Sequence, residues 1–205
     1  AGILAAKNRG YSGEITIGGV PLNAVNEENL MQKVVLVRHN SYLFKGTVEE
    51  NLKMAKPDAT KEEMEAVLQK VNLLGFLQTQ DGLQTQLLEK ASNLSGGQCQ
   101  RLVIARALLR TDSAVYIFDE AASNIDVESE ELIMNVIHEL AKTKTVLLIS
   151  HRLANVVKSD KIYFLKDGEI KESGKHDELM SRNGAYRHLY ESQMALENYG
   201  KGGVA

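Results

Sequence analysis

Two short motifs in this chain carry residue types that suit the chemistry of a phosphate group. The first motif, at residues 93–101, reads Asn-Leu-Ser-Gly-Gly-Gln-Cys-Gln-Arg. Its serine stands three positions before a glutamine, which is capping-box spacing, so we expect a helix that begins there and runs to about Arg110. The two glycines leave the first-turn N–H groups without neighbouring side chains, and such a helix start can bind a terminal phosphate. The candidate nucleotide-binding residues of this motif are Ser95, Gly96, Gly97 and Gln98.

The second motif, at residues 114–120, is an apolar run that ends in two carboxylates. The run predicts a buried strand, and ligands of open α/β sheets bind at the carboxyl ends of strands. There, Asp119 could hold Mg²⁺ directly or through water, and Glu120 could act as a base or orient the water that attacks a γ-phosphate. Each motif alone has a plainer explanation, a glycine-rich cap or a solvated turn. Their occurrence together favours a nucleotide site.

A third candidate, His151, directly follows an apolar, β-branched run at residues 145–149. Parallel neighbouring strands end at the same edge of a sheet, so His151 is expected to reach the phosphate that Glu120 serves. Its position at a strand end distinguishes it from the other histidines, which individually need no catalytic role. Those are His39, His138, His176 and His188.

One element of a nucleotide site is missing from the sequence. No glycine-rich G-x-x-x-x-G-K-[ST] loop occurs anywhere in the 205 residues. Without a lysine and a nest of backbone amides, the charges of the β- and γ-phosphates are not neutralised. We therefore predict that these residues alone bind ATP poorly and do not hydrolyse it detectably.

Composition narrows the classes of partner. The formal net charge of −3 provides no polycationic face, so nucleic acid is not an expected partner. The single cysteine, Cys99, cannot form an internal disulfide, which suits a reducing compartment. No apolar run reaches the roughly 18–20 residues that span a bilayer, so membrane association would need a partner or another segment.

Helical and strand patterns alternate along the chain, which predicts an α/β fold with a mainly parallel sheet. A helical region at residues 48–110 separates the sheet-forming segments 1–47 and 111–205, and no strand is expected between residues 70 and 88. Strands are predicted at 13–18, 33–37, 114–118 and 145–149, a hairpin at 161–171, and helices at 60–70, 95–110, 126–140 and 184–199.

These motifs resemble the nucleotide-binding domain of ABC transporters, most closely of the exporter type. Residues 94–98 match the signature motif of that family, and residues 115–120 match its Walker B strand. Residues 123–126, Ser-Asn-Ile-Asp, are similar to its D-loop, and His151 falls on its switch histidine. The resemblance to exporter sequences extends to residues 43–51, to Glu89, and to the closing segments 168–170 and 174–179.

The resemblance implies a P-loop NTPase-like core with a helical signature subdomain. It also implies ATP and Mg²⁺ in the full-length parent, a second nucleotide-binding domain, and a transmembrane permease domain at the cytoplasmic face of the cell membrane. In that family, ATP is sandwiched in a head-to-tail dimer. The signature residues Ser95, Gly96 and Gly97 then act on the ATP of a partner, and Gln98 and Asp126 complete the nucleotide-binding set. Asp119, Glu120 and His151 act on the ATP of their own subunit.

Two departures from the family pattern stand out. Residues 1–7 resemble the end of the helix that follows the phosphate loop, so the chain is expected to be truncated at its start. His39 stands where the Q-loop glutamine is expected, at the metal site, and imidazole is a poor partner for a hard cation. That change is consistent either with a weakened site or with a tolerated substitution in a mobile loop.

Two other functions share the signature motif. A soluble ABC-type ATPase, such as a repair or ribosome-associated member, usually inserts a coiled coil or a basic arm, and this sequence has neither. A non-catalytic regulatory or dimerisation module is the second alternative. The transported substrate stays open among cysteine or thiol, lipid, peptide and drug.

Overall fold

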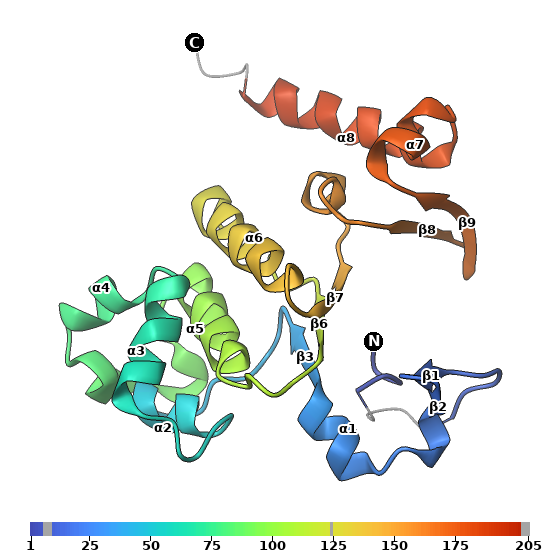
Figure 1. The fold of residues 1–205 in the computed structure, drawn as a ribbon. Helices are drawn as coiled ribbons and strands as arrows, with labels where there is room; N and C mark the ends of the chain where they lie inside the picture. The colour runs from blue at the N-terminus through green and yellow to red at the C-terminus, as the bar shows by residue number, and fades with distance from the viewer. Residues whose placement is uncertain (6–9, 124, 202–205) are drawn as a thin grey trace. The chain divides into compact units, whose positions relative to one another are not determined.

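The computed structural model describes residues 1–5, 10–123 and 125–201, with side chains up to residue 196. The chain divides into two compact units, Ala1–Ile149 and Ser150–Ala205 (Figure 1). Asn124 of the D-loop-like segment and the last part of segment 1–7 lie outside the described residues. At the start, the Ala5 N–H donates to the Ala1 C=O at 3.2 Å, which closes a turn. The α/β class with a mainly parallel sheet is confirmed.

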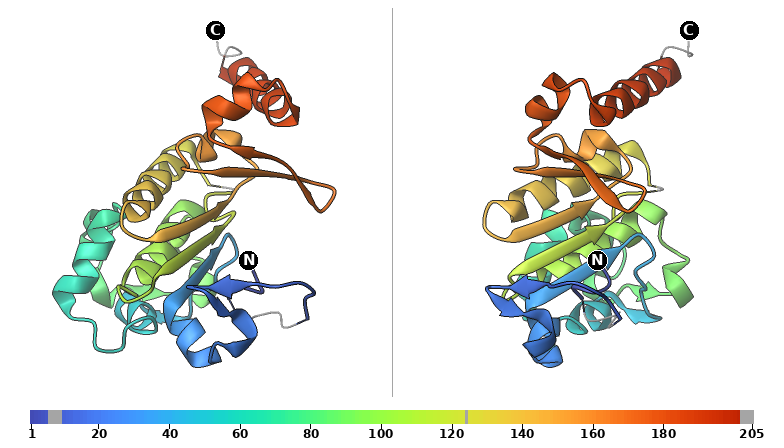
Figure 2. Two further views of the ribbon diagram at one scale, coloured as in Figure 1. Left: turned by 45° about the vertical axis from the view of Figure 1, so that its right-hand side comes forward. Right: turned by 90° about the vertical axis from the view of Figure 1, so that its right-hand side faces the viewer.

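A three-stranded parallel sheet forms the centre of the first unit (Figure 2). Its strands are β3 (Val34–Arg38), β6 (Val115–Asp119) and β7 (Thr145–Ile149), in the order β3-β6-β7. The pairing is residue for residue, so the carboxyl ends of all three strands lie in one row. All three strands were predicted from their apolar runs, as is typical of strands covered on both faces.

Alternate residues of the strands enter two different hydrophobic clusters, because successive side chains point to opposite faces of a sheet. One face packs against α5 (Gly96–Leu108) and α6 (Val127–Ala141), and its fully buried side chains include Phe118 and Ile104. The other face contributes Ile117, also fully buried, to a smaller cluster with the amino-terminal segment. The central strand β6 therefore joins both cores.

The amino-terminal segment contains a hairpin and one helix. The hairpin pairs β1 (Thr16–Ile17) with β2 (Val20–Pro21), a shorter strand pair than residues 13–18 predicted. Gly18 and Gly19 form its turn with φ of 59° and 81°, and two positive φ angles are what a two-residue hairpin of this kind requires. A single 3₁₀ turn, η1 (Leu22–Ala24), leads into α1 (Glu27–Lys33).

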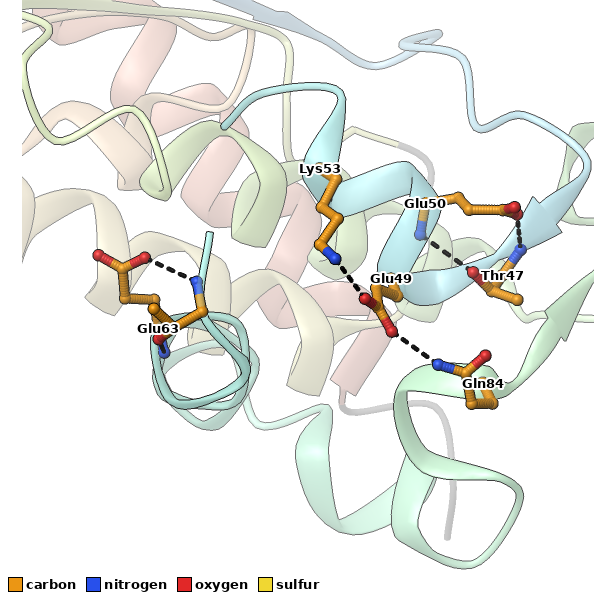
Figure 3. A network of polar contacts seen from close by, with 7 residues as sticks. Thr47, Glu49, Glu50, Lys53, Glu63 and Gln84 are labelled. Carbon is orange, nitrogen blue, oxygen red and sulfur yellow. Dashed lines mark hydrogen bonds and ion pairs between the residues drawn. The ribbon is translucent and has the colours of Figure 1, made fainter. Parts of the chain in front are cut away.

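Three helices follow β3, namely α2 (Val48–Lys53), α3 (Lys61–Lys70) and α4 (Leu74–Gln78). Both α2 and α3 begin with capping boxes, and the one at Thr60 and Glu63 was predicted. Figure 3 shows the box at Thr47 and Glu50, and beside it Glu49, which accepts hydrogen bonds from Lys53 Nζ at 2.5 Å and Gln84 Nε2 at 2.6 Å. The bond from Lys53 is the largest cause of a lowered Glu49 pKa.

The prediction of no strand between residues 70 and 88 was wrong. After the 3₁₀ turn η2 (Gly82–Gln84), β5 (Gln86–Leu87) pairs antiparallel with β4 (Gly46–Thr47). A strand of two residues is too short to show alternation in a sequence, and its pairing depends on distant contacts such as the burial of Leu87. A further 3₁₀ turn, η3 (Glu89–Ala91), precedes the signature segment.

The second unit contains a hairpin and two helices. A 3₁₀ turn, η4 (Leu153–Val156), precedes β8 (Ile162–Lys166) and β9 (Glu169–Gly174), which form the predicted hairpin. The helices are α7 (His176–Ser181) and α8 (Ala185–Lys201). Tyr186 of α8 is fully buried, and its hydroxyl lies 2.8 Å from Nδ1 of His176. Within the described residues, no helix combines the length and apolar character that crossing a bilayer requires.

Asn51 links α2 to the loop after β3 and is fully buried. Its Oδ1 accepts from the Phe44 N–H at 2.9 Å, and its Nδ2 donates to the carbonyls of Phe44 and Thr47 at 2.9 and 3.0 Å. We expect Asn51→Ala to lower the free energy of unfolding by about 1–3 kcal/mol, because three backbone groups lose their partner. Urea denaturation followed by circular dichroism measures the change.

The matched control is Gln69→Ala, on the exposed face of α3. We expect it to change the free energy of unfolding by less than about 0.5 kcal/mol. Equal effects of the two substitutions would contradict the role given to Asn51.

Candidate functional site

Three predicted site residues lie together at the carboxyl edge of the sheet. Arg38, Asp119 and Ile149 stand side by side in the register as the last residues of their strands. The pairing continues one residue further, because the His39 N–H donates to the Asp119 C=O at 3.3 Å and the Glu120 N–H donates to the Ile149 C=O at 3.0 Å. The backbone thus places His39, Asp119 and Glu120 next to one another.

Asp119 has an ionic partner that the sequence did not reveal. Nε of Arg38 lies 3.6 Å from Oδ2 of Asp119, and the two side chains are 38% and 27% exposed. At this exposure, an ion pair contributes at most about 1 kcal/mol. The sequence shows that Arg38 directly precedes His39. Only the strand register shows that Arg38 lies opposite Asp119.

Asp119 fits Mg²⁺ better than His39 does. A partly exposed carboxylate at a strand end offers the oxygen that this cation prefers, whereas an imidazole nitrogen does not. Among the described residues, no group of three or more His, Cys, Asp and Glu side chains is arranged to hold a metal. Mg²⁺ is usually held by one or two carboxylates together with phosphates and water, and a lone Asp119 suits that mode.

Glu120 adopts a backbone conformation that is unusual for its residue type, with φ of 54°. The turn that follows holds it there, because the Ser123 N–H and hydroxyl donate to the Glu120 C=O at 3.1 and 2.9 Å. A non-glycine residue in this region stores roughly 1–3 kcal/mol of strain, and such strain concentrates at functional sites.

The first motif folds as predicted at its start. Ser95 caps α5: its Oγ accepts from the Gln98 N–H at 3.2 Å, and Gln98 Oε1 accepts from the Ser95 N–H at 2.9 Å. Ser95 and Gly96 are exposed, while Gly97 is buried. The exposed residues leave the start of α5 accessible to a ligand.

Gly97 has a packing role that the sequence did not indicate. A Cβ at this position would lie 2.9 Å from Oδ2 of Asp126 and closer still to Oγ of Ser129. The start of α6 therefore packs directly against the signature glycine. Because Asp126 belongs to the D-loop-like segment, the structure brings two predicted nucleotide-binding residues, Gly97 and Asp126, into contact.

Asp126 caps α6, as predicted from the sequence. Its Oδ1 accepts from the Ser129 N–H at 2.8 Å. Hydrogen bonds from the backbone and side chain of Ser129 lower the pKa of Asp126, and the charge of Arg101 adds to this effect. The carboxylate is therefore ionised at neutral pH.

Helix α5 also contacts the segment after β3. Nε2 of Gln100 donates to the Arg38 C=O at 3.4 Å, and Arg106 donates to the Tyr42 C=O at 2.8 Å. Burial lowers the pKa of Arg106. A cavity of about 290 Å³ opens beside these contacts. It is lined by residues of β3, the following loop, the segment just after α2, and α5 and its end, among them Val37, Ser41, Phe44, Met54 and Arg106.

His151 belongs to the second unit, so its predicted proximity to Glu120 stays a prediction. In that unit its backbone C=O accepts a hydrogen bond from Nε2 of Gln193 in α8 at 2.7 Å. Gln193 belongs to none of the sequence motifs.

Gly97→Ala is expected to lower the free energy of unfolding by about 1–3 kcal/mol, because the new methyl group collides with Asp126 and Ser129. Gly96→Ala is the matched control, since the neighbouring glycine is exposed. Thermal unfolding of the two variants measures the difference. A Gly96→Ala variant that loses as much stability as Gly97→Ala would contradict the packing role.

Comparisons with known proteins give a consistent result. Residues 1–123 match the family model described as ABC transporter. A protein of Haemophilus influenzae named as an uncharacterized ABC transporter ATP-binding protein is 49% identical over 195 residues, which are 95% of this chain and 35% of that protein. An ATP-dependent lipid A-core flippase of Vibrio vulnificus is 41% identical over 184 residues, which are 89% of this chain and 31% of the flippase.

A solved structure of a bacterial Atm1-family ABC exporter with ATP bound matches this fold with a TM-score of 0.87. The two sequences are 29% identical, and the match covers 94% of this chain and 34% of the exporter chain. This chain therefore spans about a third of the length of the proteins that it matches.

Proposed function

Because this chain belongs to the ABC transporter family, we propose that it supplies residues that bind and hydrolyse ATP to power transmembrane export. The observation that carries the proposal is the alignment of His39, Asp119 and Glu120 at one edge of the parallel sheet. The ATP-binding exporter components among its relatives support the same role.

On this proposal, each residue at the sheet edge has a separate task. Asp119 holds Mg²⁺, and the ion when bound neutralises charge on the phosphates. Glu120 accepts a proton from the attacking water or orients it, from a backbone held in the left-handed region. His151, in the loop after β7, is proposed to contact the γ-phosphate. Arg38 neutralises Asp119 whenever no cation is there.

The signature residues act on a nucleotide held by a second domain of the same kind. The exposed start of α5, with Ser95 as its cap, offers backbone N–H groups and the positive end of a helix dipole to a γ-phosphate. Asp126 contacts Gly97, so it lies beside the start of α5. Two full-length domains of this kind, each with a phosphate loop and joined head to tail, would form two ATP sites.

A permease is the second proposed partner, and the chain would act at the cytoplasmic face of the membrane. Two exposed aromatic side chains, Tyr42 and Phe44, stand in the loop after β3 with ring centroids 4.8 Å apart. Their loop borders the cavity next to α5, and Arg106 holds the Tyr42 C=O. Exposed aromatic side chains of this kind are typical of protein interfaces.

The test of ATP hydrolysis uses a chimera in which this chain replaces the segment that it matches in the Vibrio vulnificus flippase. We expect Mg²⁺-dependent hydrolysis by the chimera and none by the 205 residues alone, because they contain no phosphate loop. Glu120→Gln should lower the turnover of the chimera at least about 100-fold, since it removes the base. A phosphate-release assay measures both.

Glu128→Gln is the matched control, because it makes the same chemical change at an exposed residue of α6. Normal turnover in the Glu120→Gln chimera would contradict the role of Glu120. Hydrolysis by the isolated chain that Glu120→Gln abolishes would contradict its predicted inactivity.

His39 gives a second test at the same edge. We expect His39→Gln to raise turnover of the chimera several-fold, because an amide oxygen is a better partner for Mg²⁺ and water than an imidazole. The backbone bond from His39 to Asp119 does not depend on the side chain, so thermal stability should not change. Unchanged turnover would instead identify His39 as a tolerated substitution.

A further inference from the structure

The backbone around His151 is held by one side chain of the carboxy-terminal helix. Gln193 of α8 donates from Nε2 to the His151 C=O at 2.7 Å. Its Oε1 accepts from the Leu153 N–H at 2.9 Å. One amide group therefore binds a carbonyl and an N–H that stand two residues apart, much as a neighbouring strand would.

Further hydrogen bonds lie within the loop itself. The Ser150 hydroxyl accepts from the Arg152 N–H at 3.0 Å and donates to the Arg152 C=O at 3.1 Å. Asn155 Nδ2 lies 3.5 Å from the same hydroxyl. These bonds shape the loop, whereas Gln193 attaches it to a helix some forty positions further along the chain.

Helix α8 is itself anchored within the second unit. Tyr186, seven residues and thus two turns before Gln193, lies on the same side of the helix and is fully buried. Its N–H donates to Oε1 of Glu172 in β9 at 3.0 Å, and its hydroxyl contacts His176 of α7. The position of Gln193 is therefore set by the packing of α8 on β9 and α7.

We propose that Gln193 is a positioning residue that fixes the backbone of His151 relative to α8. The role of the imidazole in ATP hydrolysis rests on the proposed function, but the attachment itself does not. Movement of α8 would change the position of His151, so the carboxy-terminal helix controls the loop that follows β7.

The test uses the 205-residue chain labelled with ¹⁵N. In Gln193→Ala, the Leu153 amide should exchange its hydrogen roughly tenfold faster, because it loses its acceptor. The imidazole signals of His151 should shift or broaden, because the loop samples more conformations. Far-UV circular dichroism and the melting temperature should stay close to those of the parent chain.

Gln193→Glu separates the two halves of the amide. A carboxylate still accepts from the Leu153 N–H but cannot donate to the His151 C=O. Leu153 protection should therefore persist while the His151 signals move. If Gln193→Ala unfolds the second unit, Gln193→Glu still gives this result.

Ser192→Ala is the matched control, because this neighbour on α8 bonds to the His188 C=O one turn away and should affect neither readout. Unchanged Leu153 exchange or unchanged His151 signals in Gln193→Ala would overturn the proposal. A different experiment tests the proposed function. If a flippase chimera with His151→Ala hydrolyses ATP at the same rate as the chimera without that substitution, His151 has no catalytic role. The contact between Gln193 and the His151 backbone would still stand.

Discussion

The residue-for-residue parallel register of β3, β6 and β7 is the constraint on which the rest of the first unit depends. It sends alternate side chains of β6 into two cores, so Ile117 and Phe118 are buried on opposite faces. A slip of one residue would exchange those faces. It would also separate Asp119 from Arg38 and move Glu120 out of line with the end of β7.

Much of this architecture could be predicted from short-range patterns. Apolar runs predicted the three strands of the parallel sheet, and the spacing of Ser95 and Gln98 predicted the start of α5. The pairing of β4 with β5 and the ion pair between Arg38 and Asp119 could not be predicted. Both depend on contacts between residues distant in the sequence, which no local period or cap encodes.

In the candidate site, too, some features could be predicted from the sequence and others could not. Residue types alone indicated Asp119, Glu120 and the signature segment, because carboxylates and a bare helix start are what phosphate chemistry requires. The positive φ of Glu120 was not predictable, since non-glycine residues rarely adopt it. The packing of Gly97 on Asp126 was not predictable either. The two glycines indicated a helix start open to a ligand and gave no sign of contact with another helix.

Arg38 makes several connections at the sheet edge, and they differ in kind. Its guanidinium faces Asp119, its N–H donates to Oγ of Ser41 at 2.9 Å, and its C=O receives Gln100 from α5. Only the first connection is made by its side chain. Substitutions at this position can therefore retune the charge at the sheet edge while the main-chain links to the loop and to α5 persist. Electrostatics and architecture at this point of the molecule are free to evolve independently.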